Sequence, residues 1–175
     1  MIEPIAFIIV GLIAALLAFA ATKPDTFRVE RSLRINAPPD RIFSHINDLA
    51  KWTAWSPWER MDPAMKKTLS GPPAGTGAVC EWMGNSTVGH GRMEILESTQ
   101  PSRVQIKLDF FKPFKAQNQS EFTLAPHSGG TQVTWAMYGP QPYGAKVMGI
   151  VFNCDKMVGP QFETGLANLK SLAEQ

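Results

Sequence analysis

The sequence predicts an α+β fold in which a curved antiparallel sheet wraps around one long C-terminal helix, with a hydrophobic helix at the N-terminus. Three observations lead to this prediction. Residues 27–138 contain several segments in which apolar and polar side chains alternate, which is typical of half-buried strands. From Tyr143 onward the apolar residues take helical spacing. The run from Pro4 to Ala21 is apolar and carries no charge.

The N-terminal run, residues 4–21, reads PIAFIIVGLIAALLAFAA. As a helix it would measure about 27 Å, close to the hydrocarbon thickness of a bilayer. A cleaved secretory signal is the alternative, because Ala18-Phe19-Ala20 has the small-x-small pattern, but no Lys or Arg precedes Lys23. A buried core helix is a third interpretation. We expect residues 1–23 to form a transmembrane anchor and residues 24–175 to form one domain.

The charges that flank this run predict its orientation. Lys23, Arg28 and Arg31 follow it, whereas Glu3 and the terminal amine precede it. The positive-inside rule then favours a cytoplasmic domain. We therefore expect a single-pass membrane protein whose domain lies on the cytoplasmic side.

The first strand is predicted over residues 27–35, where apolar residues alternate with polar ones. Arg31 falls on the apolar face of this strand. Asn36-Ala37-Pro38-Pro39-Asp40 ends the strand and begins a short helix, because proline is favoured in a first helical turn. The following segment, residues 51–65, is rich in tryptophan and proline and is interpreted as an irregular connection.

The remaining strands and the last helix follow from the same two periodicities. Strands are predicted over residues 78–83, 91–98, 104–110, 115–124 and 131–138. Short turns join them, which indicates an antiparallel sheet with one face in water. Phe162, Leu166 and Leu169 form one stripe of the C-terminal helix, and Gly159-Pro160 is expected to kink or restart it.

Composition excludes several classes of function. Seventeen Lys and Arg against fifteen Asp and Glu give a formal net charge of +2, with no basic run, so a nucleic-acid partner is not expected. Three scattered histidines have no ligand spacing, and no catalytic or cofactor-binding motif is present, so we expect no metal and no cofactor. Cys80 and Cys154 are either two small buried side chains or a disulfide outside the cytosol.

Arg31 is the candidate polar group of the interior. A guanidinium on the apolar face is costly unless it is paired or reaches water. A salt bridge to Glu97 or Glu121 would satisfy it. The alternative is an anchor for the carboxylate or phosphate of a ligand, which suits the two-pronged donors of arginine.

Aromatic side chains form the other candidate group. Those expected on the concave face of the sheet are either core or the wall of an apolar ligand cavity. The tryptophans of segment 51–65 could gate the mouth of that cavity, lie at a bilayer interface, or cap the core. The candidate cavity residues are Arg31, Trp55, Trp58, Trp82, Phe110, Trp135 and Met137, and no catalytic residue is assigned.

Several strings of the sequence resemble a known superfamily. They are Val29-Glu30-Arg31-Ser32, Ile35-Asn36-Ala37-Pro38, Trp52-x-x-Trp55-Ser56-Pro57-Trp58, Gly130-Thr131-x-Val133-Thr134-Trp135 and Met157-Val158-Gly159-Pro160-x-Phe162-Glu163. The chain resembles the helix-grip superfamily, which includes START domains and pollen-allergen-like proteins. More narrowly it is similar to the polyketide cyclase/dehydrase branch of bacterial SRPBCC proteins, which implies a bacterial inner membrane for the anchor. The resemblance implies a cavity for apolar or amphipathic ligands and supplies no shared catalytic set.

The sequence thus predicts a membrane-anchored helix-grip domain that binds a hydrophobic or amphipathic small molecule or lipid. One alternative is an enzyme related to polyketide cyclases and dehydrases, which would need an ionisable pair inside the cavity. Another is an interaction module with a filled core, which a cavity below a few hundred Å³ would favour.

Overall fold

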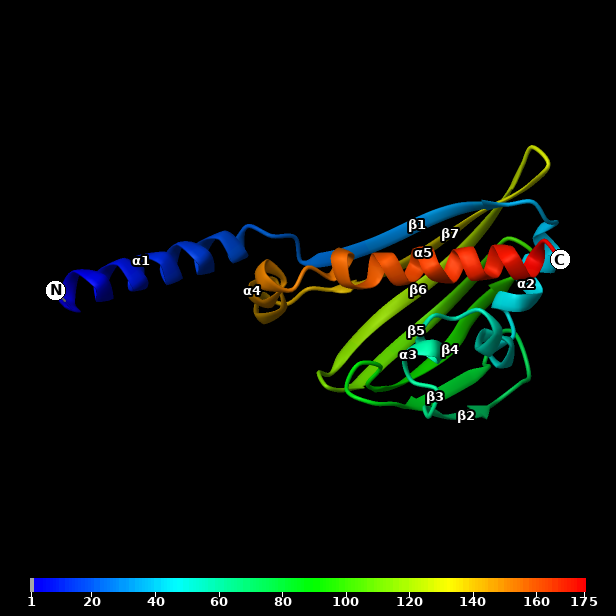
Figure 1. Cartoon of the computed structure of the whole chain (residues 1–175), viewed down its shortest axis with the longest axis horizontal. Helices are drawn as coiled ribbons and strands as arrows, with labels where there is room; N and C mark the ends of the chain where they lie inside the picture. Colours follow the sequence, from blue (N-terminus) through cyan, green and yellow to red (C-terminus); the bar gives the residue numbers. More distant parts are fainter. Residues whose placement is uncertain (1) are drawn as a thin grey trace.

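The computed structural model describes the backbone from Ile2 to Gln175 and the side chains from Phe7 onward, apart from that of residue 151. Its helices are α1 (Ile2–Ala21), α2 (Pro39–Ile46), the 3-10 helix η1 (Leu49–Ala54), α3 (Trp58–Met61), α4 (Tyr143–Val151) and α5 (Cys154–Ala173). Its strands are β1 (Thr26–Ile35), β2 (Lys66–Ser70), β3 (Val79–Met83), β4 (His90–Thr99), β5 (Arg103–Lys112), β6 (Ala116–His127) and β7 (Gly130–Pro140). The predicted α+β architecture is confirmed, and Figure 1 shows one curved sheet with α5 lying across it.

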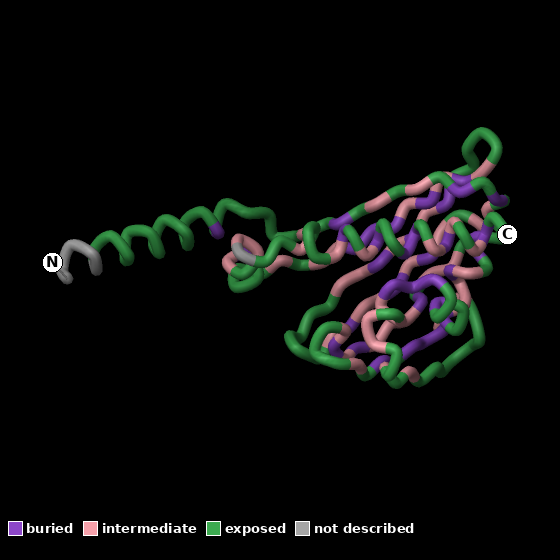
Figure 2. The backbone as a smooth tube through the Cα atoms, in the orientation of Figure 1, coloured by how far each residue is buried: buried purple, intermediate pink, exposed green. Residues whose placement is uncertain are grey.

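The seven strands form one antiparallel sheet in the order β1-β7-β6-β5-β4-β3-β2. The first strand therefore lies beside the last, with Arg31 opposite Trp135. The outer, convex face is polar: Arg103 forms ion pairs with Glu97 (2.8 Å) and Glu121 (2.6 Å). Residues coloured as buried in Figure 2 lie on the sheet, along α5 and in the α2–α3 region, and their side chains form one hydrophobic core.

Three local features differ from the sequence prediction. Segment 51–65 contains the end of η1 and the one-turn helix α3, and β2 follows where no strand was predicted. β2 is an edge strand whose side chains are mostly exposed, so its apolar pattern is weak. The last helix restarts at Asn153, whose side chain accepts a hydrogen bond from the backbone N–H of Lys156 (3.2 Å), and α5 continues through Pro160.

The N-terminal helix α1 points away from the sheet and contacts α4 (Figure 1). The hydroxyl of Tyr143 donates a hydrogen bond to the carbonyl oxygen of Leu17 (2.9 Å). Within the described part of the chain, no helix combines the length and the apolar character needed to cross a bilayer. The predicted anchor over residues 4–21 and the single-pass membrane localisation are therefore wrong, and the orientation inferred from the charges that flank the anchor no longer applies.

A bilayer core about 30 Å thick requires a helix of about 20 consecutive apolar residues, and the described helices do not supply one. Residues 4–6 of the predicted anchor lie outside the residues whose side chains are described.

The long helix α5 approaches the sheet closely because Gly165 faces it. A β-carbon at this position would lie 2.7 Å from Cζ3 of Trp135 and 3.2 Å from Cδ of Pro57. On the same side of α5, Phe162, Leu166 and Leu169 are buried, as the predicted stripe required. The Trp135 ring of β7 therefore packs directly against the backbone of α5 at Gly165.

Candidate functional site

The half of the concave face nearest α5 is filled by stacked aromatic rings. The indole of Trp135 lies between Phe162 (ring centroids 4.1 Å apart, planes at 10°) and Phe122 (4.7 Å, 29°). Its Nε1–H donates a hydrogen bond to Oγ of Ser120 (2.9 Å), so the buried indole has its polar partner. No space remains for a ligand between these three rings.

The tryptophans before β2 close this cluster from the other side. Trp55 lies 5.5 Å from Trp135 and 4.8 Å from Trp52, measured between ring centroids. The indole N–H groups of Trp52 and Trp55 donate to the backbone carbonyls of Ile46 (2.9 Å) and His45 (3.3 Å). Both rings are buried, so these two side chains cap the core.

The outer half of the concave face, over β3, β4 and β5, is less completely covered. Trp82 on β3 packs edge-on against Phe110 on β5, with ring centroids 5.8 Å apart. Phe110, its neighbour Leu108 and Met93 on β4 are only partly buried, although they point to the same side of the sheet as the core. Met93, Leu108 and Phe110 thus form, beside the buried Trp82, an apolar surface that the protein buries only in part.

Trp58 stands at the border between the two halves. It is the first residue of α3, is partly buried, and makes edge contacts with Trp135 (5.6 Å) and Phe162 (6.2 Å). Met137, on β7 beyond Trp135, is 7% exposed. The predicted aromatic residues thus fall into a filled cluster around Trp135 and an open apolar surface around Trp82.

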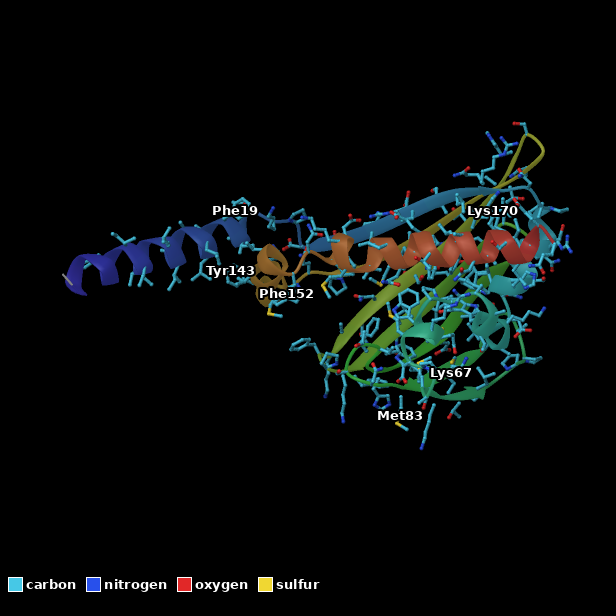
Figure 3. The ribbon with its side chains drawn as sticks, in the orientation of Figure 1. Phe19, Lys67, Met83, Tyr143, Phe152 and Lys170 are labelled. Carbon is cyan, nitrogen blue, oxygen red and sulfur yellow. The ribbon has the colours of Figure 1, made fainter. Side chains whose placement is uncertain are left out.

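An ion pair joins α3 to the edge of the sheet beside this surface. Lys67 lies on β2 and is labelled in Figure 3. Its Nζ lies 2.6 Å from Oε1 of Glu59 and 2.6 Å from Oγ1 of Thr53. Lys67 is directly opposite Trp82 in the β2–β3 pairing, so the pair borders the apolar surface. Burial raises the pKa of the nearby Cys80 thiol, which the positive charge of Lys67 counteracts less strongly. Neither Lys67 nor this role of Glu59 was foreseen, because β2 has little apolar alternation.

Arg31 lies at the edge of the concave face and is held by α5. Its guanidinium donates to Asp155 (2.8 and 3.0 Å), to Glu163 (2.7 Å) and to the backbone oxygen of Glu30 (2.8 Å). A β-carbon at Gly159 would collide with it, so the helix residue beneath the guanidinium has to be small. The salt-bridge partners expected from the sequence, Glu97 and Glu121, are instead bound to Arg103 on the convex face.

Acid is expected to weaken the attachment of α5 through this ion pair. The hydrogen bonds from Arg31 hold the pKa of Asp155 below its ordinary value of 3.8. A carboxyl whose folded-state pKa is lowered stabilises the fold above its ordinary pKa and loses that contribution as the pH falls through the lowered value. Between about pH 6 and about pH 3, urea denaturation should therefore show a larger loss of unfolding free energy in the wild type than in Asp155→Asn. Equal losses in the two proteins would contradict this role of Asp155.

Two hollows stand out on the described part of the molecule, and both lie at its surface. The larger, 470 Å³, is lined by the turn after β3 and the turn after β5. The smaller, 340 Å³, lies between β1 and α5 and is lined by Arg31, Leu33, Glu163 and their neighbours. Neither is lined by the rings around Trp135.

Within the described residues, no three His, Cys, Asp or Glu side chains gather in a way that could bind a metal ion. Cys80 is buried, Cys154 is partly buried, and both are free thiols, so the disulfide alternative is not realised.

Comparison with known proteins agrees with the architecture. The structure is similar to protein CV1439 from Chromobacterium violaceum (18% identity, TM-score 0.60), with 87% of this chain and 99% of that one covered. It is also similar to the di-domain ARO/CYC protein BexL of the BE-7585A biosynthetic pathway (15%, TM-score 0.62; 90% of this chain, 53% of that one). A third similar structure is Ara h 8.0201 (11%, TM-score 0.57; 85% and 97%).

At these identities the structural matches show the fold, which is the predicted helix-grip fold. No curated protein matches the chain significantly. The family model described as polyketide cyclase/dehydrase and lipid transport matches residues 26–174, nearly the whole of the chain beyond α1. The resemblance read from the sequence is confirmed, and the chain belongs to the polyketide cyclase/dehydrase and lipid transport family.

Proposed function

We propose that the chain binds a hydrophobic or amphipathic small molecule or lipid on the outer half of its concave face. The observation that supports this most directly is the partly buried apolar surface formed by Met93, Leu108 and Phe110 beside Trp82 and Trp58. The family description, which names cyclases and lipid transport, supports the same class of ligand.

Binding would be driven by burial of apolar area. Each Å² of apolar surface removed from water contributes about 25 cal/mol, so a ligand that buries about 200 Å² gains about 5 kcal/mol before the costs of association. The site would be an open groove, because the aromatic cluster around Trp135 fills the half of the concave face nearest α5. We do not assign Arg31 to it, because its guanidinium already binds two carboxylates.

A matched pair of leucine substitutions tests the location of the site. Leu108→Gln places an amide in the proposed groove and should weaken binding of decan-1-ol about tenfold, the equivalent of about 1.4 kcal/mol. Leu96→Gln makes the same chemical change at an exposed leucine of β4 and should change the affinity less than about twofold. Quenching of tryptophan fluorescence or calorimetry would measure both affinities. Equal effects at the two positions would contradict the proposed site.

Native mass spectrometry of the full chain, purified without added lipid from its own host, would identify the ligand. A reproducible additional mass is expected. An unliganded mass that persists after incubation with a lipid and metabolite extract would favour the alternative of an interaction module with a filled core.

A second candidate function is that of an enzyme acting on a polyketide-like substrate. The Lys67–Glu59 pair favours it, because an ionisable pair beside the apolar surface is what such chemistry would require. If the pair transfers protons, Lys67→Gln should abolish cyclisation of a linear poly-β-ketone while retaining its binding. If the pair only holds α3 against β2, the wild type should show no turnover. Lys67→Gln should then change only stability and binding.

A further inference from the structure

The strand register places Lys67 in one cross-strand row with the apolar surface of the concave face. Lys67 on β2 is directly opposite Trp82 on β3. Trp82 is in turn opposite Gly91 on β4, which is opposite Phe110 on β5. Directly opposite residues point to the same face of an antiparallel sheet, so Lys67 shares the concave face with the two rings. With strands about 4.8 Å apart, the row runs over about 14 Å.

The glycine in this row lets its two aromatic rings meet. A β-carbon at Gly91 would lie 2.5 Å from Cζ2 and 2.6 Å from Cη2 of Trp82, so the indole lies over the glycine. Gly91 thus puts no side chain between the rings of Trp82 and Phe110, which contact each other edge-on at 5.8 Å. A ligand that lies along the row passes from Phe110 over Trp82 to the side chain of Lys67.

The polar end of the row has hydrogen-bonding capacity that the protein does not use. An ammonium group has three donors, and Nζ of Lys67 uses two of them, for Thr53 and Glu59 (both 2.6 Å). Among the residues that the structure describes, neither the third donor nor Oε2 of Glu59 has a partner. The side chains of Lys67 and Glu59 are 23% and 17% exposed, so both groups are accessible.

The charges of this pair decide which head group it suits. A lone ammonium would favour an anion, but the carboxylate 2.6 Å away cancels its charge. The pair instead offers a donor and an acceptor side by side, and a hydroxyl can use both at once. A ligand carboxylate would face Glu59 with the same charge, and a ligand ammonium would face Lys67, so both ions are disfavoured.

We propose that the Lys67–Glu59 pair binds a neutral hydroxyl or enol group of the ligand, whose apolar part lies along Trp82 and Phe110. The inference rests on the proposed function, because it assigns the head group of a ligand in the same groove. It selects neutral alcohols and enolised polyketide-like chains over ionised fatty acids and amines. This role requires no proton transfer, so it holds whether or not the protein is an enzyme.

The test compares three ligands with the same ten-carbon chain, decan-1-ol, decanoate and decylamine, in the full-length protein at neutral pH. The wild type should bind decan-1-ol at least about tenfold more tightly than either ion. Glu59→Gln leaves the ammonium uncompensated and should improve decanoate relative to decan-1-ol about tenfold. Lys67→Gln leaves the carboxylate uncompensated and should improve decylamine by a similar factor. A pair that is only structural would affect all three ligands alike.

Two further variants control for loss of structure. Glu94→Gln breaks an ion pair of the same kind, with Arg92 (2.8 Å), on the convex face. It should leave the three relative affinities within about twofold of the wild type. The double variant Glu59→Lys with Lys67→Glu restores the pair in reverse and should recover the preference for decan-1-ol. Circular dichroism verifies the fold of each variant, and the wild-type preference needs no variant at all.

The outcomes separate this inference from the proposed function. If decan-1-ol binding depends on Leu108 but neither single variant shifts the preference toward an ion, the pair does not bind the head group and the groove stands. A wild type that prefers decanoate or decylamine to decan-1-ol would refute the inference in the same way. If none of the three ligands binds the wild type, both proposals fail.

Discussion

Replacing Trp135 with alanine is expected to lower the free energy of unfolding by about 3–5 kcal/mol, the range for large aromatic residues in cores. The indole is 2% exposed and is stacked between Phe122 and Phe162, so its removal leaves a cavity that neither ring can fill without moving. The substitution also leaves the hydroxyl of Ser120 without its donor. Urea denaturation followed by circular dichroism measures the loss.

Trp58→Ala provides the comparison. Trp58 is partly buried and touches the same rings only at their edges, so we expect at most about half the loss of stability. Because Trp58 borders the proposed groove, this variant should weaken decan-1-ol binding more than it weakens the fold. If Trp135→Ala lowered the free energy of unfolding by less than about 1.5 kcal/mol, the aromatic cluster would relax easily. The half of the concave face nearest α5 could then open to a ligand.

Gly165→Ala is expected to destabilise the protein by about 1–3 kcal/mol. In an exposed helix interior the same change gains about 1 kcal/mol. Here the added methyl group would lie 2.7 Å from the Trp135 ring and 3.2 Å from Pro57, so either α5 or the ring has to move. The thermal midpoint and the urea midpoint should both fall.

Gly144→Ala is the matched control, because Gly144 lies in α4 and has no atom within 4 Å of the position where its β-carbon would be. It should leave stability unchanged or raise it by up to about 1 kcal/mol. If both variants behave alike, the close approach of α5 to the sheet is not what Gly165 provides.

The strands and the last helix were predictable because their signals are local. Residues 104–110 alternate strictly and form β5, and the stripe through Phe162 and Leu166 is the face of α5 that is buried. The position of Arg31 on the concave side followed from the same alternation. The N-terminal segment shows the limit of such signals: its hydropathy led to a membrane anchor, and the described helices do not support one.

The site was less predictable because it depends on pairing between distant segments. Trp82 and Trp135 look alike as inward-facing tryptophans of two strands, yet Trp82 borders the proposed groove and Trp135 is enclosed by rings from α5 and β6. The partners of Arg31 come from α5, more than a hundred residues away, and the sequence favoured glutamates that belong to the other face.

The position of β1 beside β7 has a consequence for how the chain is made. Residues 26–35 leave the ribosome before their partners, residues 131–140, and before the helix that covers them. Domains generally fold as units, and sheets with distant pairings fold slowly because a long loop has to close first. The nascent protein therefore carries β1 without its partner strand until residues 131–140 have been made. A chaperone that binds extended segments would find β1 accessible during this interval, and its release would be timed by the completion of β7 and α5.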